Sequence, residues 1–167
     1  MRDKPWLFCD IDGVISLWGF DPNECPPGTW HNVEGIGHFL SSTAAGHLHD
    51  LAESFDLVWC SGWEEKAPEH LPALLGVPDL PHLTFARNVG GGPVSRAHWK
   101  LDAIDAYAGD RPLAWIDDAL EDDCETWAAA REAPTLLVHT EPSTGLTDEH
   151  VELLRAWQRG LPPPRAA

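Results

Sequence analysis

Carboxylates, a hydroxyl and a lysine follow one another along this chain in an order that could perform chemistry on a phosphate ester. They are Asp10, Asp12 and Gly13, then Ser61 and Gly62, then Lys100, and last Asp117, Asp118 and Asp122. Three of these groups directly follow short apolar runs that read as buried strands. Because the carboxyl ends of parallel strands meet at one edge of a sheet, we expect a single site there.

Asp10 and Asp12 lie on one predicted tight turn and can take different roles. Asp10, nearer the strand, could attack phosphorus and form an aspartyl-phosphate. Asp12 could give a proton to the leaving oxygen and later accept one from the hydrolytic water. Mutual repulsion would raise the pKa of one carboxyl of the pair. The structural alternative is an Asx-type turn, in which Gly13 supplies an unusual backbone angle.

Ser61 and Lys100 are the candidates for holding a phosphoryl group. The Ser61 hydroxyl and the backbone N–H groups from Gly62 onward could bind phosphate oxygens at a helix start, or Ser61 could simply cap that helix. Lys100 falls roughly 60–80° to one side of the apolar stripe of a helix predicted over 96–108. It therefore flanks the buried face and could stabilise Asp10 and a transferring phosphoryl group, the alternative being a solvated lysine.

The acidic cluster Asp117, Asp118 and Asp122 completes the set. Its structural alternative is a helix cap followed by acids that suit the helix dipole. Three carboxylates added to Asp10 and Asp12 would repel one another strongly without a cation. A hard, partly hydrated ion with oxygen ligands fits best, so the pattern predicts Mg²⁺.

Alternating strand and helix patterns must position these groups. Strands are predicted at 6–11, 56–60, 82–86, 112–117 and 134–139. Helices are predicted at 43–54, 96–108, 120–132 and 147–159, with Ser95 and Thr147 as N-caps and Gly160 as a stop. A helix over 64–75 is doubtful because it would contain Pro68 and Pro72. This alternation predicts an α/β fold, with helices on both faces of a five-stranded parallel sheet in three Rossmann-like layers.

The segment 13–42 is too long for a plain loop, and we expect a flap or small insertion with extended pairing over 33–42. Within it, Trp18, Trp30 and His31 could stack a base or line the site, or could simply pack the loop onto the domain. Elsewhere, we expect Trp59, Trp99 and Trp115 to lie in the core and His98 to lie at the surface. We expect one domain over 1–160 and a disordered tail over 161–167.

Composition sets limits on partners and compartment. The 167 residues carry a net charge of −16, which repels duplex nucleic acid and anionic lipid at long range. No apolar stretch approaches the roughly 20 residues of a membrane span, and we expect a cytoplasmic protein. The four cysteines have no C-x-x-C spacing and are expected to be free thiols, although a zinc site that uses Cys25 and Cys124 is the alternative.

These motifs resemble the four signature motifs of the haloacid dehalogenase (HAD) superfamily, in its phosphatase branch. The resemblance implies a Rossmann-like core and a phosphoaspartyl mechanism with Mg²⁺. An aspartate at position 12 favours phosphoryl transfer over carbon–halogen cleavage. The resemblance implies that Asp10 is the nucleophile and a metal ligand, and that Asp12 is the acid/base and binds the metal through its carbonyl. It implies that Asp118 binds the metal with support from Asp117 and Asp122. The phosphoryl-binding residues that it implies are Ser61, Gly62 and Lys100.

The resemblance also bears on the substrate. Neither 13–42 nor 87–95 is long enough for the sizeable cap domains of the superfamily, so the chain is expected to be capless or nearly so. An open site would admit a phosphorylated small molecule, a nucleotide or a nucleic-acid end, and within the superfamily the chain is similar to small domains of RNA-repair proteins. The leading hypothesis is a phosphomonoester phosphatase. The alternatives are a phosphotransferase that uses the same intermediate and a non-catalytic binding module.

Overall fold

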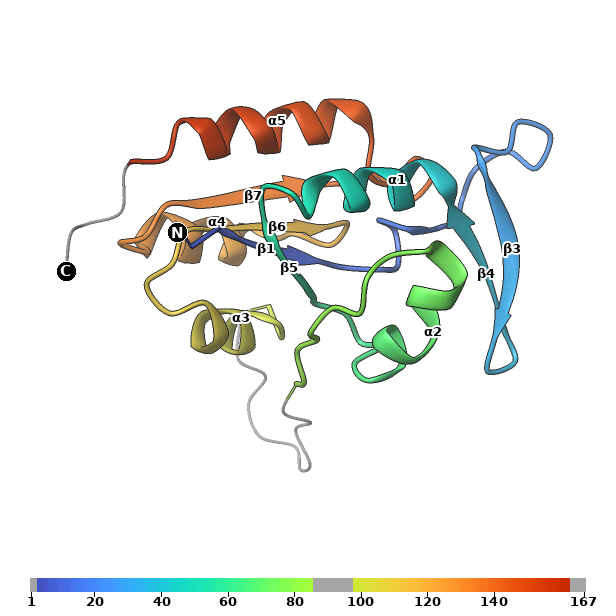
Figure 1. Cartoon of the computed structure of the whole chain (residues 1–167), viewed down its shortest axis with the longest axis horizontal. Coiled ribbons are helices and arrows are strands. Elements are labelled where there is room, and N and C mark those ends of the chain that lie inside the picture. Colours follow the sequence, from blue (N-terminus) through green and yellow to red (C-terminus); the bar gives the residue numbers. More distant parts are fainter. Residues whose placement is uncertain (1–2, 86–97, 163–167) are drawn as a thin grey trace.

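A parallel sheet of four strands forms the centre of the protein. The computed structural model describes residues 3–85 and 98–162. Strands β1 (Trp6–Cys9), β5 (Asp56–Trp59), β6 (Leu113–Asp117) and β7 (Thr135–His139) lie side by side in the order β5-β1-β6-β7 (Figure 1). Because β1 pairs with both β5 and β6, the chain that leaves β1 emerges between the ends of two neighbouring strands.

The prediction of a fifth strand over 82–86 is wrong for residues 82–85, the part of that range that the structure describes. Only His82 forms a parallel bridge, to Trp59 at the end of β5. The backbone N–H of Leu83 still donates to the Trp59 carbonyl at 2.9 Å, but the N–H of Phe85 donates to the Glu64 carboxylate at 3.1 Å instead of to the sheet. The side chain of Glu64 therefore ends the pairing after a single bridge.

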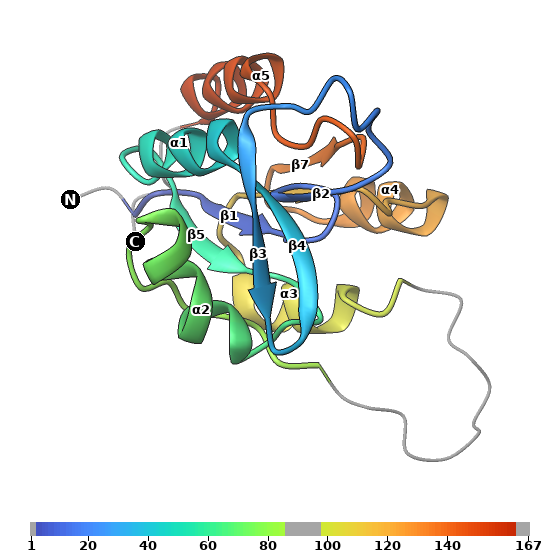
Figure 2. The ribbon, with the colours of Figure 1, turned by 90° about the vertical axis from the view of Figure 1, so that its right-hand side faces the viewer.

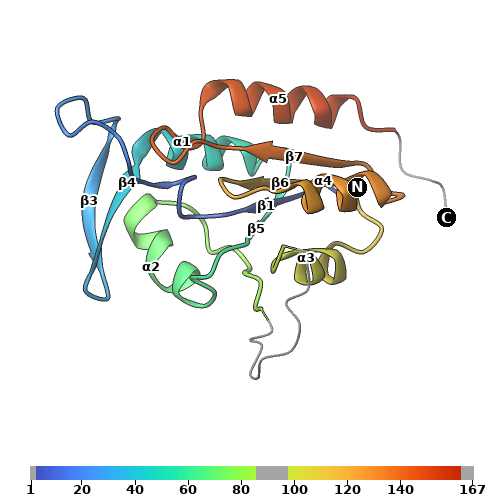
Figure 3. The ribbon, with the colours of Figure 1, turned by 180° about the vertical axis from the view of Figure 1, so that it is seen from behind.

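Helices cover both faces of the sheet, as the sequence predicts. Alternating strand residues send Leu7 into a core with α1 (Ser42–Leu51), α2 (Lys66–Leu75) and α5 (Asp148–Arg159), and send Phe8 into a second core with α3 (Leu101–Ala108) and α4 (Asp122–Ala130). Figure 3 shows α1 and α5 on one side of the sheet and α3 on the other. The three-layer α/β prediction is therefore confirmed.

Helix α2 forms despite its two prolines, so the doubt about 64–75 is wrong. Pro68 is the third residue of the helix, where the backbone N–H groups have no partner within the helix in any case. Pro72 alone costs a hydrogen bond of the helix interior. At the other end of the chain, α5 begins after Thr147 and ends before Gly160, as predicted. Ser95 and residues 163–167 of the predicted tail lie outside the described residues.

The segment after β1 folds into a small antiparallel sheet, which we call the flap. It consists of β2 (Ser16–Leu17), β3 (Gly28–Val33) and β4 (Ile36–Ser41) in the order β2-β4-β3. A two-residue turn joins β3 to β4, with Glu34 at φ 51° and Gly35 at φ 87°. The extended pairing predicted over 33–42 is confirmed by β4. In Figure 2 the β3–β4 hairpin stands in front of the central sheet, beside α2.

Residues just before α3 differ most from the sequence prediction. Trp59 and Trp115 are buried as expected, but Trp99 is 58% exposed, so its assignment to the core is wrong. His98, expected at the surface, is only 8% exposed and packs edge-on against Trp115 at 5.2 Å. Helix α3 begins at Leu101, so the helical periodicity assumed over 96–108 does not apply to either residue.

In the part of the chain that the structure describes, no helix is both long enough and apolar enough to cross a membrane.

Candidate active site

One edge of the central sheet carries the turns that follow β1 and β5, together with the end of β6. The backbone N–H of Asp10 donates to the Ile116 carbonyl of β6 at 3.0 Å. On the other side, the N–H of Cys60 donates to the Cys9 carbonyl at 2.7 Å. These bonds place Asp10 between Ser61, which follows Cys60, and Asp117, the last residue of β6.

Lys100 joins two buried carboxylates at this edge. Its ammonium Nζ lies 3.0 Å from Oδ1 of Asp10 and 2.6 Å from Oδ2 of Asp117. All three side chains are buried. The remaining oxygen of Asp117, Oδ1, accepts a hydrogen bond from the Ala119 N–H at 2.9 Å. The residue before α3 thus brings its charge to the ends of β1 and β6.

Burial shifts the titration of these groups. Burial raises the pKa of Asp10 to about 7, against the opposing effect of Lys100 and with a further rise from Asp117. Desolvation lowers the pKa of Lys100, but the carboxylates of Asp10 and Asp117 outweigh it and raise that pKa above its usual value. Burial, and then Asp117, raise the pKa of Asp118. Part of each rise comes from the neighbouring Asp117 carboxylate, so three acidic groups at this site share one lysine.

This excess of acidic groups over basic ones suits a divalent cation. One carboxylate oxygen each from Asp10, Asp117 and Asp118 lie within 4.8 Å of one another. Lys100 pairs with Asp10 and Asp117 but not with Asp118 among the ion pairs of the described residues, and carboxylate oxygens are ligands that Mg²⁺ prefers. The side chain of Asp12 is not part of this group, whereas Asp117, expected only to support it, offers an oxygen of its own.

Gly13 lies directly against the Asp118 carboxyl group. Its φ is 77°, and a Cβ built on Gly13 would overlap the Asp118 carboxyl. The Gly13 carbonyl accepts a hydrogen bond from Thr140 Oγ1 at 2.9 Å, and Nε2 of His139 lies 3.0 Å from the Asp118 carbonyl. The sequence analysis missed His139 and Thr140, although their place at the end of β7 was a usable signal.

The carboxylate of Asp12 lies at the exposed side of the site, with 55% of its side chain accessible. Its Oδ2 accepts a hydrogen bond from Nε1 of Trp63 at 3.1 Å. Nδ1 of His38, on β4 of the flap, lies 3.8 Å from its Oδ1. The sequence analysis missed both residues; Trp63 could have been found two places after Ser61, whereas nothing in the sequence marks His38.

Ser61 is buried and does not cap a helix. Its Oγ accepts a hydrogen bond from the Trp63 N–H at 3.3 Å, and α2 begins only at Lys66 with Glu65 as its N-cap. The cap alternative is therefore wrong, and Ser61 lies in a turn beside Asp10. Gly62 is exposed. Asp122 is exposed in the first turn of α4 and is not part of the three-carboxylate group.

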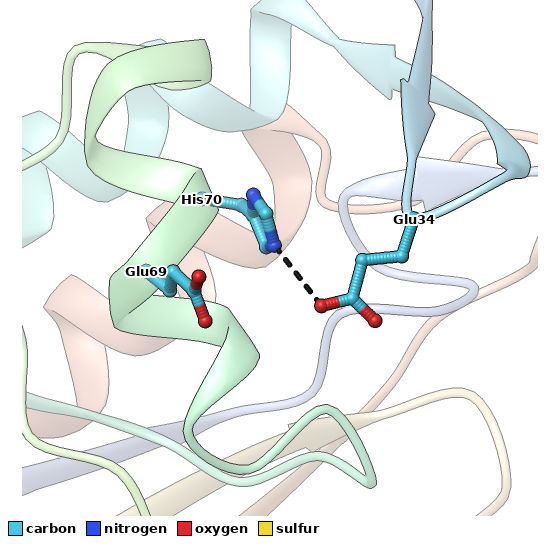
Figure 4. Close-up of side chains that lie close together, drawn as sticks. All are labelled: Glu34, Glu69 and His70. Atoms are coloured by element: carbon cyan, nitrogen blue, oxygen red, sulfur yellow. Dashed lines mark hydrogen bonds and ion pairs between the residues drawn. The ribbon is translucent and has the colours of Figure 1, made fainter.

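A second acidic group lies between the flap and α2 (Figure 4). Glu34 at the flap turn, with Glu69 and His70 of α2, offers ligand atoms within 4.8 Å of one another. The Lys66 ammonium already pairs with Glu34, and Nε2 of His70 lies 3.5 Å from Glu34 Oε1. The group is largely exposed, and we describe it as a contact between the flap and α2.

Comparison with known proteins agrees with this geometry. The family described as "HAD domain in Swiss Army Knife RNA repair proteins" matches residues 6–151. A search among curated proteins gave no match. The matched region contains the whole three-carboxylate site, its lysine and the flap, and the resemblance to small domains of RNA-repair proteins is thereby confirmed. The chain belongs to the family of HAD domains in Swiss Army Knife RNA repair proteins.

Proposed function

We propose that this protein is a Mg²⁺-dependent phosphatase that hydrolyses a phosphomonoester through an aspartyl-phosphate on Asp10. The observation that carries the proposal is the buried Lys100 ammonium between the carboxylates of Asp10 and Asp117, at the ends of adjacent strands. Membership of the HAD family supports a hydrolase of the phosphatase type. The family description names RNA repair, which favours a nucleotide or a nucleic-acid end as the phosphorylated substrate.

In the first step an Asp10 oxygen attacks phosphorus. The new bond joins Asp10 Oδ to phosphorus, and the bond from phosphorus to the leaving oxygen breaks. Lys100, already 3.0 Å from Asp10 Oδ1, can follow the phosphoryl oxygens and balance their charge as the bond forms. The Ser61 hydroxyl and the N–H groups of its turn can donate to the remaining phosphoryl oxygens.

Asp12 serves as the acid and then as the base. Its protonated carboxyl gives a proton to the leaving oxygen, and the product alcohol departs through the open side where Asp12 is exposed. A water molecule then attacks the phosphoryl group, Asp12 takes its proton, and the bond from Asp10 to phosphorus breaks. Inorganic phosphate leaves, and Asp10 and Asp12 return to their starting states.

The carboxylates of Asp10, Asp117 and Asp118 would hold Mg²⁺. When bound, this ion neutralises charge on the carboxylates and on the phosphoryl group. The residues fit this ion because three carboxyl groups lie close together beside one lysine, and the pKa values of Asp10 and Asp118 are raised. We assign Asp122 no direct part, since it is exposed and outside this group.

The test is phosphate release from an aryl phosphate and from a panel of nucleotides and 3′- or 5′-phosphorylated oligonucleotides. We expect release with Mg²⁺, none with EDTA, and none from Asp10→Asn in either condition. Circular dichroism of the variant serves as the folding control. Metal-independent release, or an active Asp10→Asn variant, would contradict the mechanism.

Two alternatives are separated by further readouts. An added alcohol that receives the phosphoryl group in preference to water would identify a phosphotransferase, which the ratio of phosphorylated alcohol to free phosphate measures. A folded, Mg²⁺-binding protein that releases no phosphate from any member of the panel would instead favour a binding module.

A further inference from the structure

The carboxylate of Asp12 is held by a side chain that no motif assigns to the site. The indole N–H of Trp63 donates to Asp12 Oδ2 at 3.1 Å across 51 positions of sequence. Trp63 lies two residues after Ser61, in the turn that leads to α2. Because Asp12 is otherwise exposed on a short turn, this bond restricts the directions in which its carboxyl can point.

The flap in turn holds Trp63. The ring of His38 on β4 packs against the Trp63 indole with centroids 4.6 Å apart and the planes at 60°. Nδ1 of His38 lies 2.9 Å from Oγ of Ser16, which is on β2 of the same flap. The histidine ring is thereby anchored on one side to the flap and on the other to the indole that contacts Asp12.

A second contact fixes the flap against the same region of the chain. At the flap turn, Glu34 pairs with Lys66 and approaches His70, both on α2 (Figure 4). The flap therefore contacts α2 at its tip and the turn before α2 through His38. Of the two contacts, the one through His38 packs directly against the indole that bonds to Asp12.

We propose that Trp63, packed by His38 of the flap, is a positioning residue that orients the Asp12 carboxyl for proton transfer to the leaving oxygen. This inference rests on the proposed phosphatase function. Because the indole N–H occupies Oδ2, Oδ1 is the oxygen of Asp12 that is left to face the leaving group. In the phosphoryl-transfer step the proton passes from Asp12 Oδ1 to the leaving oxygen, whose bond to phosphorus breaks, and the indole N–H remains on Oδ2.

A positioning role has a signature that a merely structural role lacks. A leaving group of high pKa needs a proton as its bond to phosphorus breaks, whereas a good leaving group departs as an anion without help. The constant kcat/KM reports the steps up to phosphorylation of Asp10, and so it contains the proton donation but not the later hydrolysis. A misplaced acid therefore lowers kcat/KM for poor leaving groups only.

The experiment compares kcat/KM for 2,4-dinitrophenyl phosphate and for a simple alkyl phosphate in the full chain with Mg²⁺. We expect Trp63→Phe, which keeps an aromatic ring but removes the N–H, to lower kcat/KM about tenfold or more for the alkyl ester and less than about twofold for the dinitrophenyl ester. His38→Ala should show the same selective loss, and His38→Phe, which keeps a ring against the indole, a smaller one.

Asp12→Ala and Trp157→Phe serve as the two references. Trp157 lies near the end of α5 and stacks on Phe55, the residue before β5, at the opposite end of that strand from Ser61. We expect Trp157→Phe to leave both constants unchanged and Asp12→Ala to show the largest selective loss.

Each pattern of results has one meaning. A selective loss in Asp12→Ala, with equal losses or none for both esters in Trp63→Phe, would overturn the positioning role while leaving the proposed function intact. The absence of a selective loss in Asp12→Ala would overturn the acid role on which both rest. Thermal unfolding of each variant shows whether an equal loss on both esters comes from partial unfolding.

Discussion

The contact between Gly13 and Asp118 makes Gly13→Ala a direct test of the proposed metal site. Gly13 has φ 77°, and a Cβ there would overlap the Asp118 carboxyl group. The turn cannot easily move away, because Thr140 Oγ1 holds the Gly13 carbonyl at 2.9 Å. We therefore expect Asp118 to be displaced from the position in which it faces Asp10 and Asp117.

The magnitude has a backbone part and a metal part. A non-glycine residue in the left-handed region costs about 1–2 kcal/mol of unfolding free energy. Gly19→Ala is the matched control, since Gly19 has φ 76° and nothing within 4 Å of its Cβ position. If displacement of Asp118 weakens Mg²⁺ binding about tenfold, then at 100 times the wild-type Kd the stabilisation by Mg²⁺ falls from about 2.7 to about 1.4 kcal/mol.

The assay is urea unfolding of wild type, Gly13→Ala and Gly19→Ala, each with Mg²⁺ and with EDTA. Titration calorimetry gives the Mg²⁺ affinity independently. We expect both variants to lose stability in EDTA, but only Gly13→Ala to be stabilised less by Mg²⁺ than the wild type, by about half as much. Equal stabilisation of all three proteins by Mg²⁺ would refute the reasoning, because it would mean that Asp118 is not a ligand or that the overlap does not displace it.

Three further perturbations test other parts of the site. Lys100→Met should lower the unfolding free energy of the metal-free protein by about 3–5 kcal/mol at pH 8, because Asp10 and Asp117 then lack their buried partner. A loss below about 1 kcal/mol in urea unfolding would contradict the ion pairs. The Mg²⁺ affinity should fall as the pH drops from 8 to 6, because the pKa of Asp10 is raised to about 7 and below that pH a proton competes with the metal. Calorimetry in buffers of different ionisation enthalpy would show the proton release on binding. A Mg²⁺ affinity that does not change with pH would contradict this prediction. Glu34→Gln removes an exposed ion pair with Lys66, so the urea unfolding midpoint should stay close to that of the wild type, and a clear fall of the midpoint would mean that the flap contact contributes to global stability.

Much of the fold follows from local patterns in the sequence. The apolar runs before Asp10 and Asp117 form β1 and β6, and the capped pattern after Thr147 forms α5. Strand–helix alternation then leaves few topologies, because parallel strands require right-handed crossovers. The placement of chemistry at the strand ends follows from the same rule, and for this reason Asp10, Asp117 and Asp118 could be named without a structure. Asp117 was expected only to support the metal site, and Lys100 was named from a helical spacing although α3 begins only at Leu101.

Where the sequence prediction was wrong, a competing contact decided the outcome. Among the described residues of the predicted strand, only His82 pairs with β5, because the Glu64 carboxylate takes the Phe85 N–H. His98 is buried and Trp99 is exposed because the helix begins only at Leu101, so periodicity does not govern them. Contacts of this kind depend on where a loop ends, which hydrophobic patterning does not specify.

The residue types and their order thus determined by themselves the fold class, the edge of the sheet that carries the candidate site, and the residues that we propose as nucleophile, acid and cation ligands. The tertiary structure alone decided which groups meet. Trp63 reaches Asp12 across 51 positions, and His38 reaches it from a flap whose sequence carries no motif. Gly13 meets Asp118 from a different strand end. Hydrophobic periodicity predicts which face of a helix or strand is buried. Contacts between residues far apart in the sequence depend instead on the path of the loops and on the packing of side chains between them.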